Sequence, residues 1–428
     1  MKRTGLIFLL TVCLLAFGAG LGAVGAYEVP PGVLSPDEVD FGGKTVTIVS
    51  SDFWKALPSE ERIAEAEEAF NVNIETLLID NADLMMARIM SGDAKYDIIQ
   101  QAHRSAYFAL VTAGMLLPAD DYLPEEYFEW LPSMDRYTIE KFKYEGKRYG
   151  VALHDGVVND SIIIMSYNKD LLEQYNLPDP YELYLNGEWT VDVLEEMMIA
   201  VTQDTNGDGV IDQWGMPDIT NGPGFFRWAP FNGAEIAVQD ENGRWTYAYN
   251  QENAIYALNK VIHWKNLGII GPGNYNNGTL AFNPTHLPGN RHAQAAGVNF
   301  GLVPLPKGPH VDRYYYPAFE FFLTYLPANV EEPENMIALA NFLFRKDDRY
   351  NFLDEIITNW MVTKEHLDMY LAANENWQAD GDIFQHTEIW DIVGDAVNQV
   401  LSGSKGAAAA MDEIAPQVQA ALDDLFRQ

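Results

Sequence analysis

Cysteine is almost absent from this sequence. Cys13 is the only one in 428 residues, and it lies between Val12 and Leu14 in an apolar run near the N-terminus. A single thiol excludes disulfides within the chain and metal sites built from several thiolates. A lipid-anchored precursor places its cysteine after small residues at the cleavage point, so we expect no lipid anchor here.

Basic residues are also scarce. Lys and Arg total 27 against 62 Asp and Glu, which gives a formal net charge of −35. A surface this acidic repels nucleic acid and anionic lipid headgroups. The balance therefore predicts no nucleic-acid partner, and it favours a neutral solute over an anionic one.

Catalytic signatures are missing too. The sequence has no G-x-S-x-G, no H-E-x-x-H, no phosphate-binding P-loop and no G-x-G-x-x-G after a predicted strand. A glycosidase needs only two carboxyl groups facing each other across a cleft, and 62 acidic residues leave such a pair open. We therefore predict a protein that is not an enzyme, with a glycoside-active enzyme as an alternative.

Residues 1–26 have the pattern of a secretory signal peptide. Lys2 and Arg3 form a basic start, an apolar run follows, and small residues lead to Ala26. The apolar run is short and is interrupted by glycines, which argues against a membrane anchor. We expect a secreted protein, located in the periplasm or at the cell surface, whose mature chain begins near Tyr27.

The mature chain is long enough for two hydrophobic cores. Apolar periodicity predicts strands at 44–50, 72–79 and 96–100, with helices at 60–70 and 84–90 between them. Strands that alternate with helices favour a parallel sheet covered on both faces. Such sheets bind ligands at the carboxyl ends of their strands, here the segments 51–54 and 101–104.

Two stretches carry a family resemblance. Residues 149–215 contain YGVALHDG, SIIIMSYNKDLLEQYNLPDP and NGEWTVDVLEEM in close order, and residues 300–309 read FGLVPLPKGP. Both resemble extracellular solute-binding protein family 1, the maltose-binding-protein-like sugar receptors of bacterial ABC importers. The resemblance implies an α/β, two-lobe periplasmic-binding-protein type II fold with three interlobe crossings.

The same resemblance implies a division of the chain. Lobe one would comprise residues 27–153 and 283–345, and lobe two residues 154–282 and 346–428, with a helix-rich C-terminus. Helices are expected at 350–357, 367–373, 389–401 and 411–426. The resemblance also implies a monomer that works with the membrane permease subunits of an ABC importer.

The candidate ligand site combines residues at strand ends and predicted lobe crossings with the aromatic segment 222–236 and with two loops that the resemblance implies at the cleft. Aromatic rings stack on the apolar face of a sugar, while amide, imidazole, guanidinium and carboxylate groups bond its hydroxyls. The candidates are Trp54, Gln101, His103, Arg104, His154, Asp155, Trp228, Asn232, His286, Glu320 and Trp360. Trp228 is the leading stacking residue, and packing in the core is its alternative role.

Residues 204–215 resemble a calcium-binding loop. Asp204, Asn206, Asp208 and Asp212 occupy oxygen-ligand positions 1, 3, 5 and 9, and Val210 offers a carbonyl at position 7. Position 12, where a glutamate would chelate with both oxygens, is Gly215. The motif predicts a structural Ca²⁺ site that needs another ligand, and an Asx-rich surface turn is the alternative.

Together these features predict a receptor that captures a carbohydrate, which the resemblance implies is an oligosaccharide, and carries it to a transporter. Receptors for a peptide or another solute are the alternatives from the same fold, and a scaffold that binds neither is a third. The motifs define the scaffold, whereas nothing in them selects the solute.

Overall fold

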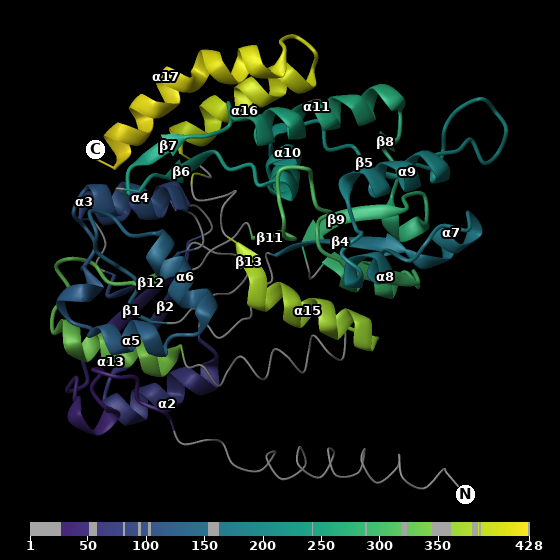
Figure 1. Ribbon diagram of the computed structural model, residues 1–428. Coiled ribbons are helices and arrows are strands. Elements are labelled where there is room, and N and C mark those ends of the chain that lie inside the picture. The colour runs from purple at the N-terminus through teal and green to yellow at the C-terminus, as the bar shows by residue number, and fades with distance from the viewer. Residues whose placement is uncertain are drawn as a thin grey trace, which may run out of the picture.

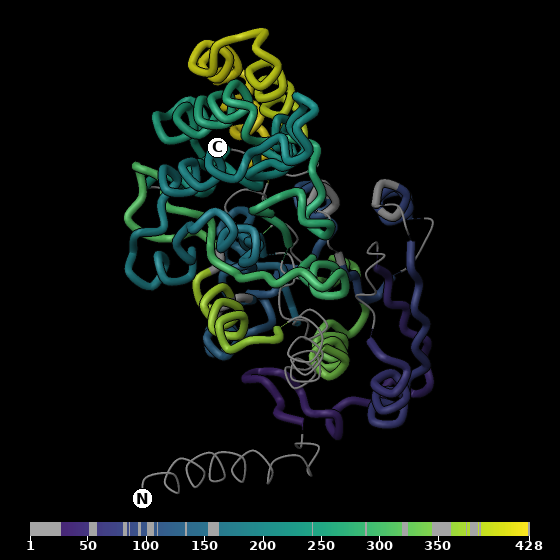
Figure 2. Tube along the Cα trace, turned by 90° about the vertical axis from the view of Figure 1, so that its right-hand side faces the viewer, coloured from purple at the N-terminus to yellow at the C-terminus, as the bar shows by residue number. Residues whose placement is uncertain are grey.

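The computed structural model describes residues 27–50, 58–79, 82–92, 96–101, 104–152, 162–241, 243–286, 289–318, 323–344, 361–378, 384 and 387–426. These residues form two lobes, each built on its own sheet (Figure 1). The C-terminal helices lie at the opposite end of the molecule from the helix at residues 60–70, as Figure 2 also shows. Within the described residues, no helix is both long and apolar enough to cross a bilayer.

Lobe one contains a four-stranded sheet in the order β12-β3-β1-β2. Strand β1 (Thr45–Ser50) pairs in parallel with β2 (Asn73–Leu78) and β3 (Ile98–Gln101), and β12 (Leu323–Tyr325) pairs antiparallel with β3. The helices are α2 (Glu60–Phe70), α3 (Ala82–Ser91), α4 (Arg104–Thr112), α5 (Glu125–Trp130), α6 (Ser133–Lys141) and α13 (Pro333–Leu343), with short 3₁₀ helices η1 (Pro36–Glu38) and η2 (Ala119–Asp121).

The central strands of this sheet are buried on both faces. Ile48 and Val49 of β1 and Ile98 and Ile99 of β3 all lie in the core, so neighbouring side chains on opposite faces are covered. This confirms the predicted β-α-β order and the parallel pairing. Helix α2 has the predicted bounds, and the other elements differ from the prediction by one or two residues at their ends.

Lobe two is built on the antiparallel sheet β10-β4-β9. Its strands are β4 (Ile163–Asn168), β9 (Phe282–His286) and β10 (Phe300–Val303), and the short pairs are β5 (Met216–Pro217) with β8 (Ile270–Gly271), β6 (Ala237–Gln239) with β7 (Trp245–Tyr247), and β11 (Tyr316–Pro317) with β13 (Trp377–Gln378). The helices are α7 (Lys169–Gln174), α8 (Pro180–Leu185), α9 (Val191–Val201), α10 (Gly222–Trp228), α11 (Glu252–Leu267), α12 (Asn290–Ala295), α15 (Lys364–Asn376), α16 (Glu388–Leu401) and α17 (Ala407–Leu425), with η3 (Ala229–Asn232) and η4 (Tyr275–Asn277).

Sequence signals account for several helix starts in this lobe. Asn168 caps α7 by accepting a hydrogen bond from the Leu171 amide, and Thr190 caps α9 by accepting one from Val193, as its place before the helix predicts. All six residues of β4 are buried, in agreement with the dense apolar run that the sequence shows there.

The predicted boundary at Asn283 is corrected by the strand pairing. Strand β9 pairs with β4 from Phe282 to His286, and β10 pairs with the other edge of β4. Ala318 still forms a bridge with Ile162 in lobe two, whereas Leu323 already belongs to the sheet of lobe one. The described strands and bridges between residues 283 and 318 therefore belong to lobe two. The chain returns to lobe one between Ala318 and Leu323.

The described residues on either side of 153–161, 319–322 and 345–360 belong to different lobes; these three intervals, called the passages below, lie outside the described residues. Bridges flank the first two passages at both ends: Ala152 with Thr324 in lobe one, and Ile162 with Ala318 in lobe two. These two passages therefore leave and enter each lobe side by side, which is the arrangement expected of a hinge.

Helix α15, which follows the third passage, is fastened to lobe two by a buried histidine. The His366 ring stacks on Phe300 at 4.4 Å between centroids, and its Nε2–H donates to the Phe300 carbonyl at 2.8 Å. The Glu365 carboxylate contacts the Lys169 ammonium at 2.5 Å, and Tyr181 donates to Asp368 at 3.3 Å. The helix is thus held along its first turns.

Burial lowers the pKa of His366 below its usual 6.5, and Lys169 lowers it further while the Phe300 hydrogen bond and Glu365 oppose the shift. The unfolded chain then takes up the proton first as pH falls. We expect the contribution of neutral His366 to the free energy of unfolding to be fully present above about pH 6.5. Below that pH the contribution should decrease, by up to about 1.4 kcal/mol per pH unit. Urea unfolding at pH 7 and 5 should show this loss in the wild type and a smaller one in His366→Gln; equal losses would contradict it.

Candidate functional site

The carboxyl ends of the lobe-one strands meet at one edge of the sheet. Ser50, the last residue of β1, pairs with Gln100, and Gln101 pairs with Leu323 at the start of β12. The segments 51–57, 102–103 and 319–322 are attached to this edge, and the first passage leaves from Ala152 beside Thr324. In a parallel sheet this edge is where ligands bind.

Lobe two presents one predicted site residue near its own passages. His286 ends β9 and pairs with Ile163, directly after the residue at which the chain enters the lobe. Its side chain is half-buried. His286 therefore lies at the end of the second sheet that is next to the interlobe passages.

The other predictions at this edge are only partly placed. Gln101 is the last residue of β3 and Arg104 the first of α4, so their backbones flank the edge. Six predicted residues lie outside the described part of the chain: Trp54, His103, His154, Asp155, Glu320 and Trp360. Their contribution to ligand binding stays a prediction.

Trp228 belongs to the core of lobe two. Its indole stacks on Phe231 at 4.7 Å between centroids and packs against Trp264 at 5.1 Å, which leaves the side chain 1% exposed. A sugar cannot stack on a ring whose neighbours already cover it. This packing corrects the prediction of Trp228 as the leading stacking residue, and it matches the alternative that the sequence left open.

The Asn232 side chain also has a structural role, because its hydrogen bonds are made within lobe two. Its amide oxygen accepts the His310 backbone N–H at 3.1 Å, its amide nitrogen donates to the Asn253 carbonyl at 2.8 Å, and the side chain is fully buried. These bonds fix the turn at residues 304–310 against lobe two, where Gly308 donates to Phe231 at 3.0 Å. The prediction of Asn232 as a ligand contact is therefore corrected, because both ends of its amide are used within the lobe.

A buried polar pair lies beneath the edge of the lobe-one sheet. Gln100 donates to the Thr324 hydroxyl at 3.0 Å, and both side chains are fully buried. Among the described residues, the Gln100 amide oxygen has no hydrogen-bond partner. Gln101 is a predicted site residue and Gln100 is not, although both glutamines stand at the end of an apolar strand where the sequence signals a site.

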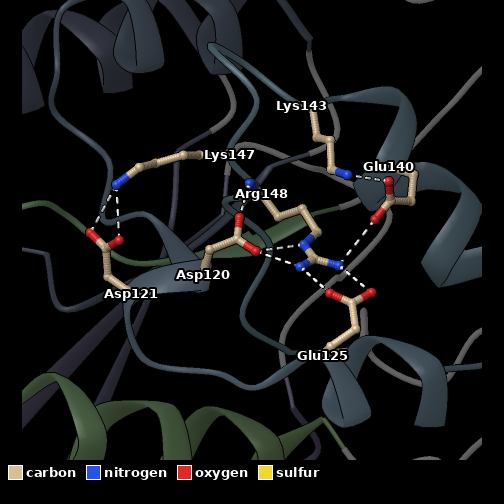
Figure 3. Close-up of polar contacts among 7 residues, drawn as sticks. All are labelled: Asp120, Asp121, Glu125, Glu140, Lys143, Lys147 and Arg148. Carbon is tan, nitrogen blue, oxygen red and sulfur yellow. Dashed lines mark hydrogen bonds and ion pairs between the residues drawn. The ribbon is translucent and has the colours of Figure 1, made fainter.

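Arg148 anchors the lobe-one end of the first passage (Figure 3). Its guanidinium donates to Asp120 at 2.8 Å, to Glu125 at 2.7 Å and to Glu140 at 3.2 Å, and it lies 3.5 Å from the centre of the Phe128 ring. Burial by itself would lower the pKa of Arg148, but the hydrogen bonds to Glu125 and Asp120 raise it overall. The Arg148 hydrogen bond in turn lowers the pKa of Glu125.

Hydrogen bonds of the Val151 backbone fix the chain to lobe one close to the start of the first passage. The Val151 amide donates to the Thr324 carbonyl at 2.8 Å, while the Val151 carbonyl accepts from the Tyr127 hydroxyl at 2.9 Å and from the Asn341 amide at 2.8 Å. The segment 148–152 is therefore fixed to lobe one, so rotation of the lobes has to be absorbed beyond it.

The 204–212 loop is exposed and ordered by its own carboxylates. Asp204 accepts the backbone N–H groups of Gly207 and Gly209, each at 2.7 Å, and these bonds, led by that of Gly209, lower the pKa of Asp204. Asp212 accepts the amide and hydroxyl of Thr205. In the described residues, no three His, Cys, Asp or Glu side chains are grouped for a metal ion. Calcium binding at Asp204, Asn206, Asp208, Val210 and Asp212 stays a prediction.

No protein-family profile matches the sequence, and no curated protein matches it. Solved structures match well. An ABC substrate-binding protein from Listeria monocytogenes in complex with cycloalternan has a TM-score of 0.61 at 17% identity, covering 90% of this chain and 99% of its own. A cyclo/maltodextrin-binding protein complexed with maltotetraose has a TM-score of 0.64 at 16% identity, covering 90% and 98%.

A third structure widens the range of solutes. It is an ABC transporter solute-binding protein from Thermotoga lettingae bound with α-D-tagatose, with a TM-score of 0.61 at 16% identity, covering 89% of this chain and 100% of its own. All three are described as binding proteins. The chain therefore has the two-lobe α/β fold of the carbohydrate-binding solute-binding proteins of ABC transporters.

Proposed function

We propose that this protein is an extracytoplasmic receptor that captures a carbohydrate between its lobes and delivers it to an ABC importer. The observation that carries the proposal is the fold, which over nine tenths of the chain resembles proteins solved with cycloalternan, maltotetraose and tagatose. Since these identities are low, the solute is inferred from the class of protein and from the site chemistry.

The position of the candidate site supports the same function. Strand ends of lobe one and the His286 end of lobe two both lie beside the interlobe passages. A solute that contacts both lobes would favour closure, and several kcal/mol of differential binding are needed to move the lobes from mostly open to mostly closed. The membrane permease would then recognise the closed shape. We propose an oligosaccharide as the solute and a monomer as the working form.

A thermal-shift screen against mono- and oligosaccharides, oligopeptides and polyols tests the proposal. A ligand present at 100 times its Kd adds about 2.7 kcal/mol to the free energy of unfolding, which raises Tm visibly. We expect a rise with a carbohydrate and none with peptides. Chromatography of the incubated sugar should show no product.

Each other outcome selects an alternative. A rise only with peptides would indicate a peptide receptor of the same fold. Release of a shortened sugar would indicate a glycoside-active enzyme that uses two carboxyl groups. No shift with any compound would contradict the receptor function.

We also propose that the protein is secreted through its residues 1–26 and that the 204–212 loop binds Ca²⁺ as a structural ion. Val210 would add a backbone carbonyl and Asn206 an amide oxygen to the three carboxylates. Calcium should then raise Tm in the wild type and not in the Asp204→Asn, Asp212→Asn double variant, as measured by calorimetry with and without chelator. An equal response of both proteins would place any calcium effect elsewhere.

A further inference from the structure

The two lobes touch through aromatic side chains that are distant in sequence. Phe426, directly after α17 in lobe two, meets Phe108 on α4 of lobe one, with ring centroids 5.6 Å apart and planes at 86°. This edge-to-face geometry is the one aromatic pairs prefer. In Figure 1 the end of α17 lies close to α4. The contact is separate from the covalent passages between the lobes.

Each partner is supported by its own lobe. In lobe two, Trp245 stacks on Phe426 at 5.4 Å and Phe384 packs edge-on against Trp245 at 5.5 Å. In lobe one, the Phe108 ring lies 6.0 Å from that of Phe142. The Tyr107 hydroxyl also donates to the Phe142 carbonyl, which ties α4 to the residue that follows α6. Each of the two rings at the interface therefore also packs against an aromatic residue of its own lobe.

A charged side chain crosses the same interface. The Lys141 ammonium at the end of α6 lies 5.5 Å from the centre of the Trp245 ring and 3.9 Å from the Glu235 carboxylate, both in lobe two. The ammonium is attracted by the face of the indole and by the carboxylate. We call Phe108, Lys141, Trp245, Phe384 and Phe426 the interlobe cluster.

Burial shows what separation of the lobes would cost. Phe108 and Trp245 are each 2% exposed, and Phe426 is half-buried. Buried aromatic side chains each remove on the order of 150–250 Å² from water, so parting the rings would return apolar surface to solvent. The interlobe cluster therefore stabilises the lobe arrangement seen here relative to any arrangement in which Phe426 leaves Phe108.

We propose that the interlobe cluster sets the balance between lobe arrangements and thereby the affinity for the transported solute. The affinity part rests on the proposed function, whereas the balance itself is a property of the ligand-free chain. A ligand that binds another arrangement must break the cluster, and one that binds this arrangement benefits from it. By linkage, removal of Phe426 changes the ligand's Kd by the same factor as it changes the population of the competent arrangement.

The test is the distance between the lobes in the ligand-free protein. Spin labels at Glu129→Cys on α5 and Asp395→Cys on α16, both exposed positions, report it in the chain from Tyr27 onward, which contains no other cysteine. We expect the distance distribution to shift or broaden in Phe426→Ala and in Phe108→Leu. The double variant should add little to either, because both substitutions remove one contact. Lys141→Met should act in the same direction.

Trp390→Ala is the matched control. Trp390 contacts Phe226 at 4.1 Å, and both rings belong to lobe two, so this variant loses an aromatic pair without touching the interface. Its distance distribution should equal that of the wild type. Coinciding distributions in the wild type, Phe426→Ala and Lys141→Met would overturn the proposal, and Lys141→Met keeps the test valid if Phe426→Ala does not fold.

Affinity is measured next, by calorimetry with the sugar that the thermal-shift screen identifies. We expect Phe426→Ala to change Kd by about 5-fold or more, the lower end of usual coupling between sites. A changed distance with an unchanged Kd would overturn the role in affinity. If the distances change in the variants but the protein binds no sugar, the role of the interlobe cluster in the lobe balance is supported and the proposed function is overturned.

Discussion

Replacing Arg148 by Met should destabilise the protein by about 2–4 kcal/mol. Breaking a buried ion pair costs about 3–5 kcal/mol because the remaining charges lose their partner, and exposure of the carboxylates reduces this figure. Asp120, Glu125 and Glu140 would face one another without the guanidinium that now joins them. Methionine keeps an apolar side chain over Phe128, so most of the loss comes from the charge.

Urea unfolding at pH 7 measures this loss, with Arg148→Lys as the control. Lysine keeps the charge but not the planar fork that contacts Asp120 and Glu125 together, so we expect an intermediate loss. Since Arg148 also holds segment 148–152, the variant should exchange the Val151 amide hydrogen faster. If the urea midpoint of Arg148→Met equals that of the wild type within experimental error, the ion pairs in Figure 3 do not stabilise the fold.

Gly308→Ala should cost a similar amount, about 3 kcal/mol, by displacing Asn232. A methyl group on Gly308 would lie 2.1 Å from the Asn232 amide oxygen, which is fully buried and bonded to His310. Overpacking costs about 1–3 kcal/mol, and a buried donor left without its acceptor costs about 1–3 kcal/mol more.

Gly406→Ala is the control for this substitution. A methyl group there meets nothing within 4 Å, and the backbone is in an ordinary extended conformation. We expect a loss below about 1 kcal/mol, since only a helix N-cap changes. Calorimetric Tm values for the two variants compare them directly, and equal Tm values would contradict the account of Asn232 as a scaffold residue.

The sequence predicted the fold where local signals and topology agree. The alternation of strands and helices in residues 44–100 is built into apolar periodicity, and the caps at Asn168 and Thr190 follow from their chemistry. It misplaced residues 283–318 because pairing with β4 is a long-range choice that no local pattern records. The resemblance at 300–309 led us to assign this segment to lobe one, whereas Phe300–Val303 pairs with β4 in lobe two.

The candidate site was predicted less well for a related reason. Trp228 and Asn232 are residue types that suit a sugar site, but the same chemistry packs a core and fixes a turn, and only neighbours in space decide between these roles. His286 was assigned to lobe one with the rest of 283–345, whereas it ends a strand of lobe two, and its role in ligand binding stays a prediction. Gln100 and Arg148 escaped notice because their partners, Thr324 and Asp120, are distant in sequence.

Small-angle X-ray scattering with and without the carbohydrate found by the thermal-shift screen tests the central claim, that a sugar is captured by closure of the lobes. At a concentration of 100 times Kd nearly all molecules carry the ligand. We expect a smaller radius of gyration and a shorter maximum dimension with the sugar than without it. Saturating sugar that leaves both dimensions unchanged would contradict capture by lobe closure.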